Sequence, residues 1–122
     1  MFAAPGTLYV FRIHQVVCAN LVTRPGEAVL LRAGSLPDEP ARFASGPGRL
    51  CRALGIVLED DGEDAVEGSR VGVWARTGPR PRIVAGPRVG IRKAADRPLR
   101  FSIAGDPAVS RARPYRRSFA QS

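Results

Sequence analysis

Three residues of this chain are of types often found at metal and redox sites: Cys18, Cys51 and His14. A structural zinc site needs four ligands, and two cysteines with one histidine cannot complete it. Both cysteines also lie in apolar stretches, "VVCANLV" and "RLCRALGI", where a reduced thiol packs as a small hydrophobic group. We therefore favour structural, reduced cysteines over a disulfide or a metal pair, and we predict no metal and no cofactor.

The charged residues predict a polyanionic partner. The 122 residues include 19 Lys and Arg against 11 Asp and Glu, which gives a net charge of +8 and a pI near 11. Six of the acids fall between Glu59 and Arg70, so the rest of the chain has 18 bases against 5 acids. Such a surface suits nucleic acid. Because the bases are nearly all arginine, a codon-usage bias stays open as an alternative.

The clearest helix signal is "SGPGRLCRALGI" at 45–56, where Ser45 could cap the helix and Pro47 suits its first turn. Apolar residues follow at helical spacing, which predicts a helix of about ten residues. Its N-terminus beside Arg49 would suit a phosphate group. An ordinary helix cap is the alternative.

The other elements predict strands. The first extended stretch is "TLYVFRI" continuing into "VVCANLV", and "AVLLRAG" follows a turn at "TRPGE". Two or three more strands are expected among "RVGVWAR", "RIVAGPRVGI" and "PLRFSIAG". Alternation places Leu8, Val10 and Arg12 on one face of the first strand and Tyr9, Phe11 and Ile13 on the other, so one face is not cleanly a core face. Strands on both sides of one helix predict an α+β fold with a mostly antiparallel sheet.

The remaining segments predict loops. Residues 34–44 are rich in Pro and acid, and residues 59–67 read as a solvated acidic loop, although a short helix is an alternative there. We expect one domain at 1–110 and a basic, disordered tail at 111–122. The chain has no apolar run long enough to span a membrane and no secretory signal at its start, so we expect a cytoplasmic protein.

Six stretches resemble one known family when they are read in this order: "MFAAPGTLYVFRI", "CANLV", "AVLLRAG", "SGPGRLCRALGI", "GPRVGI" and "PLRFSIAGDPAVS". From Met1 to about Ser110 they are similar to the 3-methyladenine (alkylpurine) DNA glycosylases. The resemblance implies a truncated C-terminal portion of that curved, mostly antiparallel fold, because the family's segment with the catalytic glutamate precedes the first stretch. A truncated gene, a misassigned start and a reduced relative are the alternatives.

The resemblance also implies roles for four side chains. Phe11 matches the position that stacks on the flipped base, and Asn20 matches a residue that excludes guanine. His14 matches the aromatic wedge of the hairpin, and Arg32 matches a residue that positions the attacking water and a phosphate. The alternatives are a plain core residue for Phe11, a turn or strand-end residue for Asn20, an exposed strand histidine for His14 and a salt-bridged arginine for Arg32.

The expected activity follows from the same resemblance. It implies base excision repair of double-stranded DNA that contains alkylated purines. We expect a monomer that associates with the nucleoid when it is bound to DNA, and we expect Ser45 and Arg49 to contact the DNA backbone. No acid matches the family's general base, and the resemblance places the loop at 59–67 far from the pocket, so we expect this chain alone to be inactive or feeble. A non-catalytic module that binds DNA or RNA, and a fragment that does not fold alone, are the alternatives.

Overall fold

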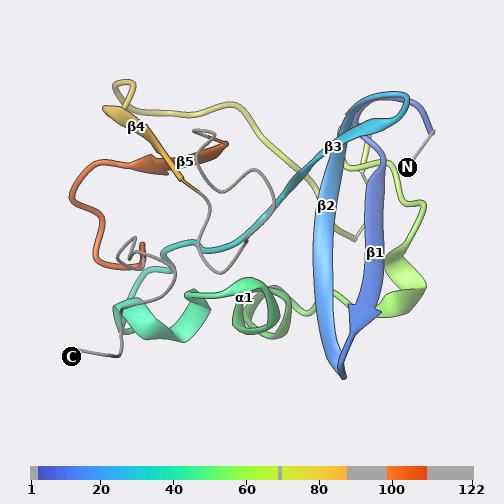
Figure 1. Cartoon of the computed structure of the whole chain (residues 1–122), viewed down its shortest axis with the longest axis horizontal. Coiled ribbons are helices and arrows are strands. Elements are labelled where there is room, and N and C mark those ends of the chain that lie inside the picture. The colour runs from blue at the N-terminus through green and yellow to red at the C-terminus, as the bar shows by residue number, and fades with distance from the viewer. Residues whose placement is uncertain (1–2, 69, 88–98, 110–122) are drawn as a thin grey trace.

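The computed structural model describes residues 3–68, 70–87 and 99–109. Within them the chain forms two antiparallel sheets and an α-helix (Figure 1), which confirms the predicted α+β class. The tail at 111–122 lies outside the described residues, as does most of "GPRVGI". The elements in chain order are β1 (Leu8–Ile13), β2 (Val16–Arg24), β3 (Glu27–Leu30), η1 (Ala41–Ala44), α1 (Pro47–Leu54), η2 (Leu58–Asp60), β4 (Ile83–Gly86) and β5 (Arg100–Ile103).

The first sheet has the strand order β1-β2-β3. The prediction that the first stretch continues unbroken into the second is wrong, because the chain turns back at His14 and Gln15. Both residues have a positive φ, 49° and 68°, as in the two-residue turns that match the twist of a hairpin. The second turn falls at Pro25 and Gly26, where the sequence predicts it. The sheet is therefore a meander whose first turn is a tight, exposed tip.

The core lies between this sheet and α1. Leu8 and Val10 of β1 pack with Ala19 of β2, Cys51 of α1 and Ile56 just beyond the helix. These are the β1 residues that alternation places on one face, so that prediction is confirmed. The opposite face of β1 carries the half-buried Tyr9 and Phe11, whereas β2 is buried on both faces, through Ala19 on one side and through Cys18 and Val22 on the other.

The boundaries of α1 differ from the prediction at its start. The cap residue is Gly46 and not Ser45, whose hydroxyl instead donates a 2.6 Å hydrogen bond to the carbonyl of Ala108. The helix ends after eight residues because Gly55 adopts a left-handed conformation with a φ of 69°. Ser45 therefore fastens the start of α1 to the segment that follows β5. Just before it, the predicted loop at 34–44 contains η1.

The acidic segment after α1 is not a simple solvated loop, because it covers the outer edge of β1. The N–H of Leu8 donates to the carbonyl of Glu63, the N–H of Gly62 donates to the carbonyl of Leu8, and the N–H of Val10 donates to a carboxylate oxygen of Asp61, each at 2.8 Å. An exposed strand edge is a site for unwanted pairing. This segment therefore protects β1 on the side away from β2.

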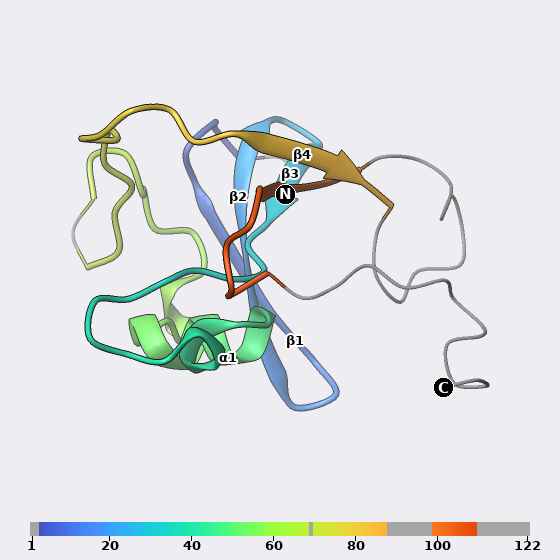
Figure 2. The same cartoon turned by 90° about the vertical axis from the view of Figure 1, so that its left-hand side faces the viewer.

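The second sheet pairs β4 with β5, as two of the predicted strands require. Of the two or three strands expected here, the candidate "RVGVWAR" at 70–76 is not a strand, since this segment is irregular and Trp74 is 82% exposed. Figures 1 and 2 place α1 and the β1–β2 turn at one end of the molecule and β4 at the other. The two ends therefore present different surfaces.

Candidate DNA lesion site

Phe11 and Asn20 lie on the same face of the first sheet. Phe11 pairs with Cys18 across the β1–β2 ladder, and Tyr9 pairs with Asn20. Paired residues of an antiparallel ladder point to the same side, and diagonal neighbours such as Phe11 and Asn20 are roughly 7 Å apart. The register therefore brings the two predicted pocket residues together.

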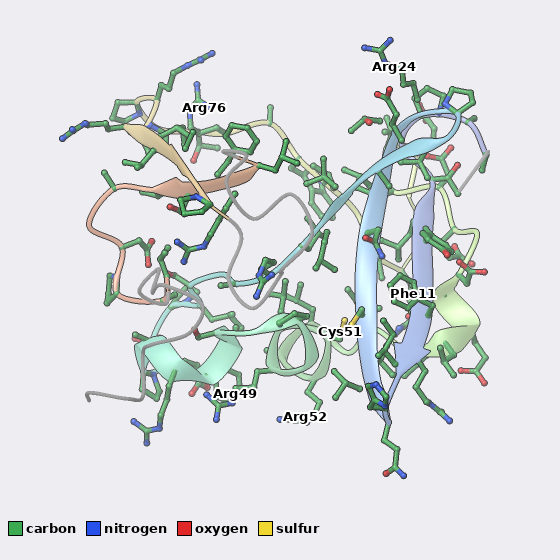
Figure 3. The ribbon with its side chains drawn as sticks, viewed as in Figure 1. Phe11, Arg24, Arg49, Cys51, Arg52 and Arg76 are labelled. Atoms are coloured by element: carbon green, nitrogen blue, oxygen red, sulfur yellow. The ribbon has the colours of Figure 1, made fainter. Side chains whose placement is uncertain are left out.

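Phe11 is not a core residue. The core cluster takes Leu8 and Val10 from β1, whereas Phe11 is half-buried on the opposite face (Figure 3). Its ring lies 5.2 Å from the ring of Tyr9 at an angle of 50°. Such a tilted aromatic pair adds about 1 kcal/mol beyond area burial and holds both rings in place. Phe11 thus offers a braced aromatic surface on this face.

Asn20 is a buried polar residue in the middle of β2, and not at a turn or strand end. It is 8% exposed, and its side-chain nitrogen donates a 3.2 Å hydrogen bond to the carbonyl of Tyr9. This bond fixes the orientation of the amide, so the side-chain oxygen has a set direction. No described residue donates a hydrogen bond to that oxygen. Asn20 therefore holds an acceptor that a ligand could use.

Sequence reasoning missed Tyr9 as a member of this site. The signal was present, because alternation places Tyr9 on the same face as Phe11. The structure adds two contacts that the pattern could not give, the ring pair with Phe11 and the carbonyl that orients Asn20. Tyr9 is therefore a positioning residue for both predicted pocket side chains.

His14 occupies the tip of the β1–β2 hairpin. It is exposed and has a φ of 49°, so it is a turn residue and not a strand histidine. A residue at such a tip projects beyond the sheet, as a wedge between base pairs must. His14, which the resemblance identifies as the wedge, is thus accessible from solvent.

Arg32 lies two residues beyond the end of β3 and is half-buried. Its carbonyl accepts a 2.8 Å hydrogen bond from the N–H of Gly46, which links the end of the sheet to the start of α1. In the described part of the chain no carboxylate pairs with its guanidinium. Within the described residues Arg32 is therefore not the salt-bridged arginine that was the alternative.

Ser45 and Arg49 flank the N-terminus of α1. Because the Ser45 hydroxyl donates to Ala108, its proton is already used inside the protein. Arg49 is exposed in the first turn of α1 (Figure 3). A phosphate at this helix end would depend mainly on Arg49 and on backbone N–H groups.

Two neighbouring carboxylates of the acidic segment have structural partners. Asp60 is buried, and Arg70 holds it with two bonds, Nη2 to Oδ2 at 2.6 Å and Nε to Oδ1 at 3.0 Å. The Arg70 hydrogen bond, followed by that from the Val57 N–H, lowers the pKa of the Asp60 carboxyl. Asp61 bonds the N–H of Val10. Both carboxylates therefore have structural partners, and the expectation that the loop at 59–67 lies far from the pocket stays a prediction.

Both cysteines are buried and free. Burial raises the pKa of the Cys51 thiol, and neighbouring Cys18 raises it further. A thiol with a raised pKa is a poor nucleophile and a poor metal ligand, which fits the structural interpretation. Within residues 3–68, 70–87 and 99–109, no His, Cys, Asp and Glu side chains gather as a metal-binding cluster. No helix of this part is long and apolar enough to cross a membrane.

Comparison with known proteins identifies the family of the chain. The family described as Methylpurine-DNA glycosylase (MPG) matches residues 1–107. Proteins from Mycobacterium bovis (strain BCG / Pasteur 1173P2) and Mycobacterium sp. (strain KMS), provisionally named 3-methyladenine DNA glycosylases, are 42% and 43% identical over 135 residues. The aligned region covers 97% of this chain and 64% of each relative, so the chain spans about two thirds of their length. The chain belongs to the methylpurine-DNA glycosylase family.

Proposed function

We propose that this chain forms the lesion-binding part of an alkylpurine DNA glycosylase that acts in base excision repair. It would flip 3-methyladenine-type bases out of double-stranded DNA as a cytoplasmic monomer without a cofactor. One observation carries the proposal: in a member of this family, Phe11 and Asn20 share a sheet face whose own hairpin presents His14 at its tip.

Recognition of the lesion depends on charge and shape. A glycosidic bond inside a duplex is out of reach, so the base must first leave the stack. His14 would fill the gap, while the alkylated purine, which is cationic, would lie over the Phe11 ring and gain about 0.5–2 kcal/mol. Asn20 would crowd the exocyclic amine of guanine and so favour adenine lesions. Tyr9 keeps both pocket side chains in position.

Hydrolysis requires water to attack the sugar carbon while the bond to the purine breaks. A carboxylate must accept the proton of that water, and Arg32 would position the water and an adjacent phosphate. Asp61 is the described carboxylate that bonds β1, and its bond to the Val10 N–H assigns it to the strand edge. We therefore expect slow hydrolysis, because such a base contributes about 10²- to 10⁴-fold.

Replacing Phe11 by alanine should remove the preference for ethenoadenine duplex over plain duplex. We expect the chain to bind duplexes with an ethenoadenine or abasic site more tightly than plain duplex. Ethenoadenine is an uncharged base that stacks on an aromatic ring, so Phe11→Ala should weaken only the ethenoadenine complex, by about fivefold or more. Phe11→Tyr keeps the aromatic face and is the matched control. Fluorescence anisotropy with the three duplexes measures this, and equal binding of all of them by the unmodified chain would contradict the proposal.

Release of 3-methyladenine from methylated DNA tests the chemical step. We expect this chain to be more than tenfold slower than a mycobacterial relative, since Asp61, the described carboxylate that bonds β1, is engaged by the Val10 N–H. Asp61→Asn should leave any residual rate unchanged, since that carboxylate serves the strand edge. Turnover within tenfold of the relative that is lost in Asp61→Asn would assign the general base to Asp61 instead.

A non-catalytic basic module is the second candidate. The observation that favours it is the set of arginines without carboxylate partners at the α1 end of the described chain. Such a module would bind plain and damaged duplexes alike, so the anisotropy experiment separates the two candidates.

A further inference from the structure

A pocket of about 350 Å³ lies between η1 and α1, outside the lesion face described above. Its lining comes from residues that are close in sequence but belong to two elements. The lining residues are Pro40, Arg42, Phe43, Arg49, Arg52 and Ala53.

The sequence of α1 explains why two arginines reach this pocket. Arg49, Arg52 and Ala53 are spaced three and four residues apart, so they lie on one side of the helix. Leu50 and Cys51 lie on the other side and are buried. The helix is thus amphipathic, and its polar stripe forms one wall of the pocket while η1 forms the other.

The pocket has three positive charges and no acidic lining residue. The ion pairs of the described chain involve Arg24 and Arg70, and none of Arg42, Arg49 and Arg52 has a carboxylate partner there. Like charges that share a pocket repel one another, and an anion bound among them would relieve the repulsion. The electrostatics therefore favour an anionic ligand, and guanidinium groups suit phosphate best.

The aromatic ring of Phe43 indicates a second feature of the ligand, a planar group. Phe43 lines the pocket and is 42% exposed, which is unusual for a phenylalanine and leaves its ring accessible. Bases stack on such rings in proteins that bind unpaired nucleotides. The volume is near the lower end of the range for small-ligand pockets. A nucleotide has one phosphate and one planar ring. It therefore matches the positive charge of the pocket, the Phe43 ring and the pocket volume together.

The position of the pocket favours DNA over a free nucleotide. A Cβ placed on Gly48 would come within 2.7 Å of Val16 Cγ1, so the first turn of α1 packs directly against the start of β2. Val16 is two residues beyond His14, the hairpin tip. Figure 3 shows Arg49 and Arg52 at this same end of the molecule, with Arg24 and Arg76 at the opposite end.

We propose that this arginine pocket binds a nucleotide of the DNA that flanks the lesion. The guanidinium groups of Arg42, Arg49 and Arg52 would hold its backbone phosphate, and Phe43 would support its sugar and base. The inference rests on the proposed function, because it takes the partner at the hairpin tip to be DNA. It assigns Arg42, Phe43 and Arg52 a role in affinity that does not depend on damage.

The test compares two double variants that remove the same charge. Arg42→Ala/Arg52→Ala should weaken binding of plain and ethenoadenine duplexes by the same factor, about tenfold, and lower the salt slope of log K by roughly 2. Arg24→Ala/Arg76→Ala, at the other end, should change affinity less than twofold. Arg42→Lys/Arg52→Lys keeps the charge and should retain most of the affinity. Equal losses in the two alanine variants would overturn the proposal, since they would indicate diffuse attraction.

Phe43→Leu tests the ring without changing the charge. Loss of stacking should lower affinity for a duplex with an unpaired flanking nucleotide about fivefold or more, with the salt slope unchanged.

Calorimetric titration with deoxyadenosine monophosphate is the second arm of the test. Nucleotide binding at the pocket that does not compete with duplex would overturn the assignment to DNA. If the Arg42/Arg52 variant equals its control while lesion preference persists, this inference fails and the proposed function stands. Circular dichroism melts establish that each variant is folded.

Discussion

Asp60→Asn should lower the free energy of unfolding by about 2 kcal/mol at pH 6. Asp60 accepts two bonds from Arg70 and one from the N–H of Val57, and Arg70 also donates to the carbonyl of Gly55. The side chain of Asp60 is 6% exposed whereas that of Arg70 is 57% exposed, so solvent screens only part of the pair. Urea denaturation followed by circular dichroism measures the loss.

The pH dependence of that loss follows from the direction of the pKa. The pKa of Asp60 is below its ordinary value of 3.8 in the folded chain. A lowered pKa stabilises the fold above about 3.8, and the stabilisation disappears as the pH falls through the folded value. The difference between the unmodified chain and Asp60→Asn should therefore be full at pH 6 and shrink below about pH 3.8.

Glu59→Gln is the matched control for this prediction. Glu59 is the exposed neighbour of Asp60, so its change removes the same charge without removing the buried bonds. We expect its effect to stay within about 0.5 kcal/mol. If Glu59→Gln and Asp60→Asn were equally destabilising, net charge and not the Asp60–Arg70 pair would explain the loss.

The affinity of the chain for plain duplex DNA should fall about 10³-fold between 50 and 200 mM salt, if lysines and arginines neutralise about six phosphates. The net charge of +8 and the unpaired arginines at the α1 end of the described chain supply the cations. Anisotropy at four salt concentrations gives the slope directly.

A duplex with uncharged methylphosphonate linkages at the contacted positions is the control for the salt experiment. Its binding should be weak and nearly independent of salt, because no counterions are released there. Affinity for the natural duplex that does not change with salt would contradict electrostatic binding and, with it, every DNA contact proposed for the basic residues.

The hairpin shows how local sequence can predict a site. Alternation in "TLYVFRI" placed Phe11 on the face opposite Leu8 and Val10, and the structure shows that Leu8 and Val10 belong to the core. The sequence could not place Asn20 diagonal to Phe11, because that depends on the register of β1 against β2. The two-residue turn at His14 and Gln15 sets this register, and neither residue is typical of such a turn.

The segment after α1 shows the opposite case. Its acids predicted a solvated loop, yet Asp60 is buried and Asp61 bonds β1, since long-range partners decide what a carboxylate does. Ser45 likewise had the right residue type for a helix cap, but its hydroxyl bonds Ala108, 63 positions away. The pattern of "RVGVWAR" predicted a strand, and the described fold gives it no ladder partner.

By itself the sequence determined the strand faces, the helix around Leu50, the basic charge and the similarity to a repair family, because these depend on composition and on neighbours a few residues apart. The tertiary structure decided which side chains meet: Tyr9 with Phe11 and Asn20, Asp60 with Arg70, and η1 with α1 around three arginines. Such contacts depend on register and on the closure of long loops, and a pattern of residue types contains no information about either.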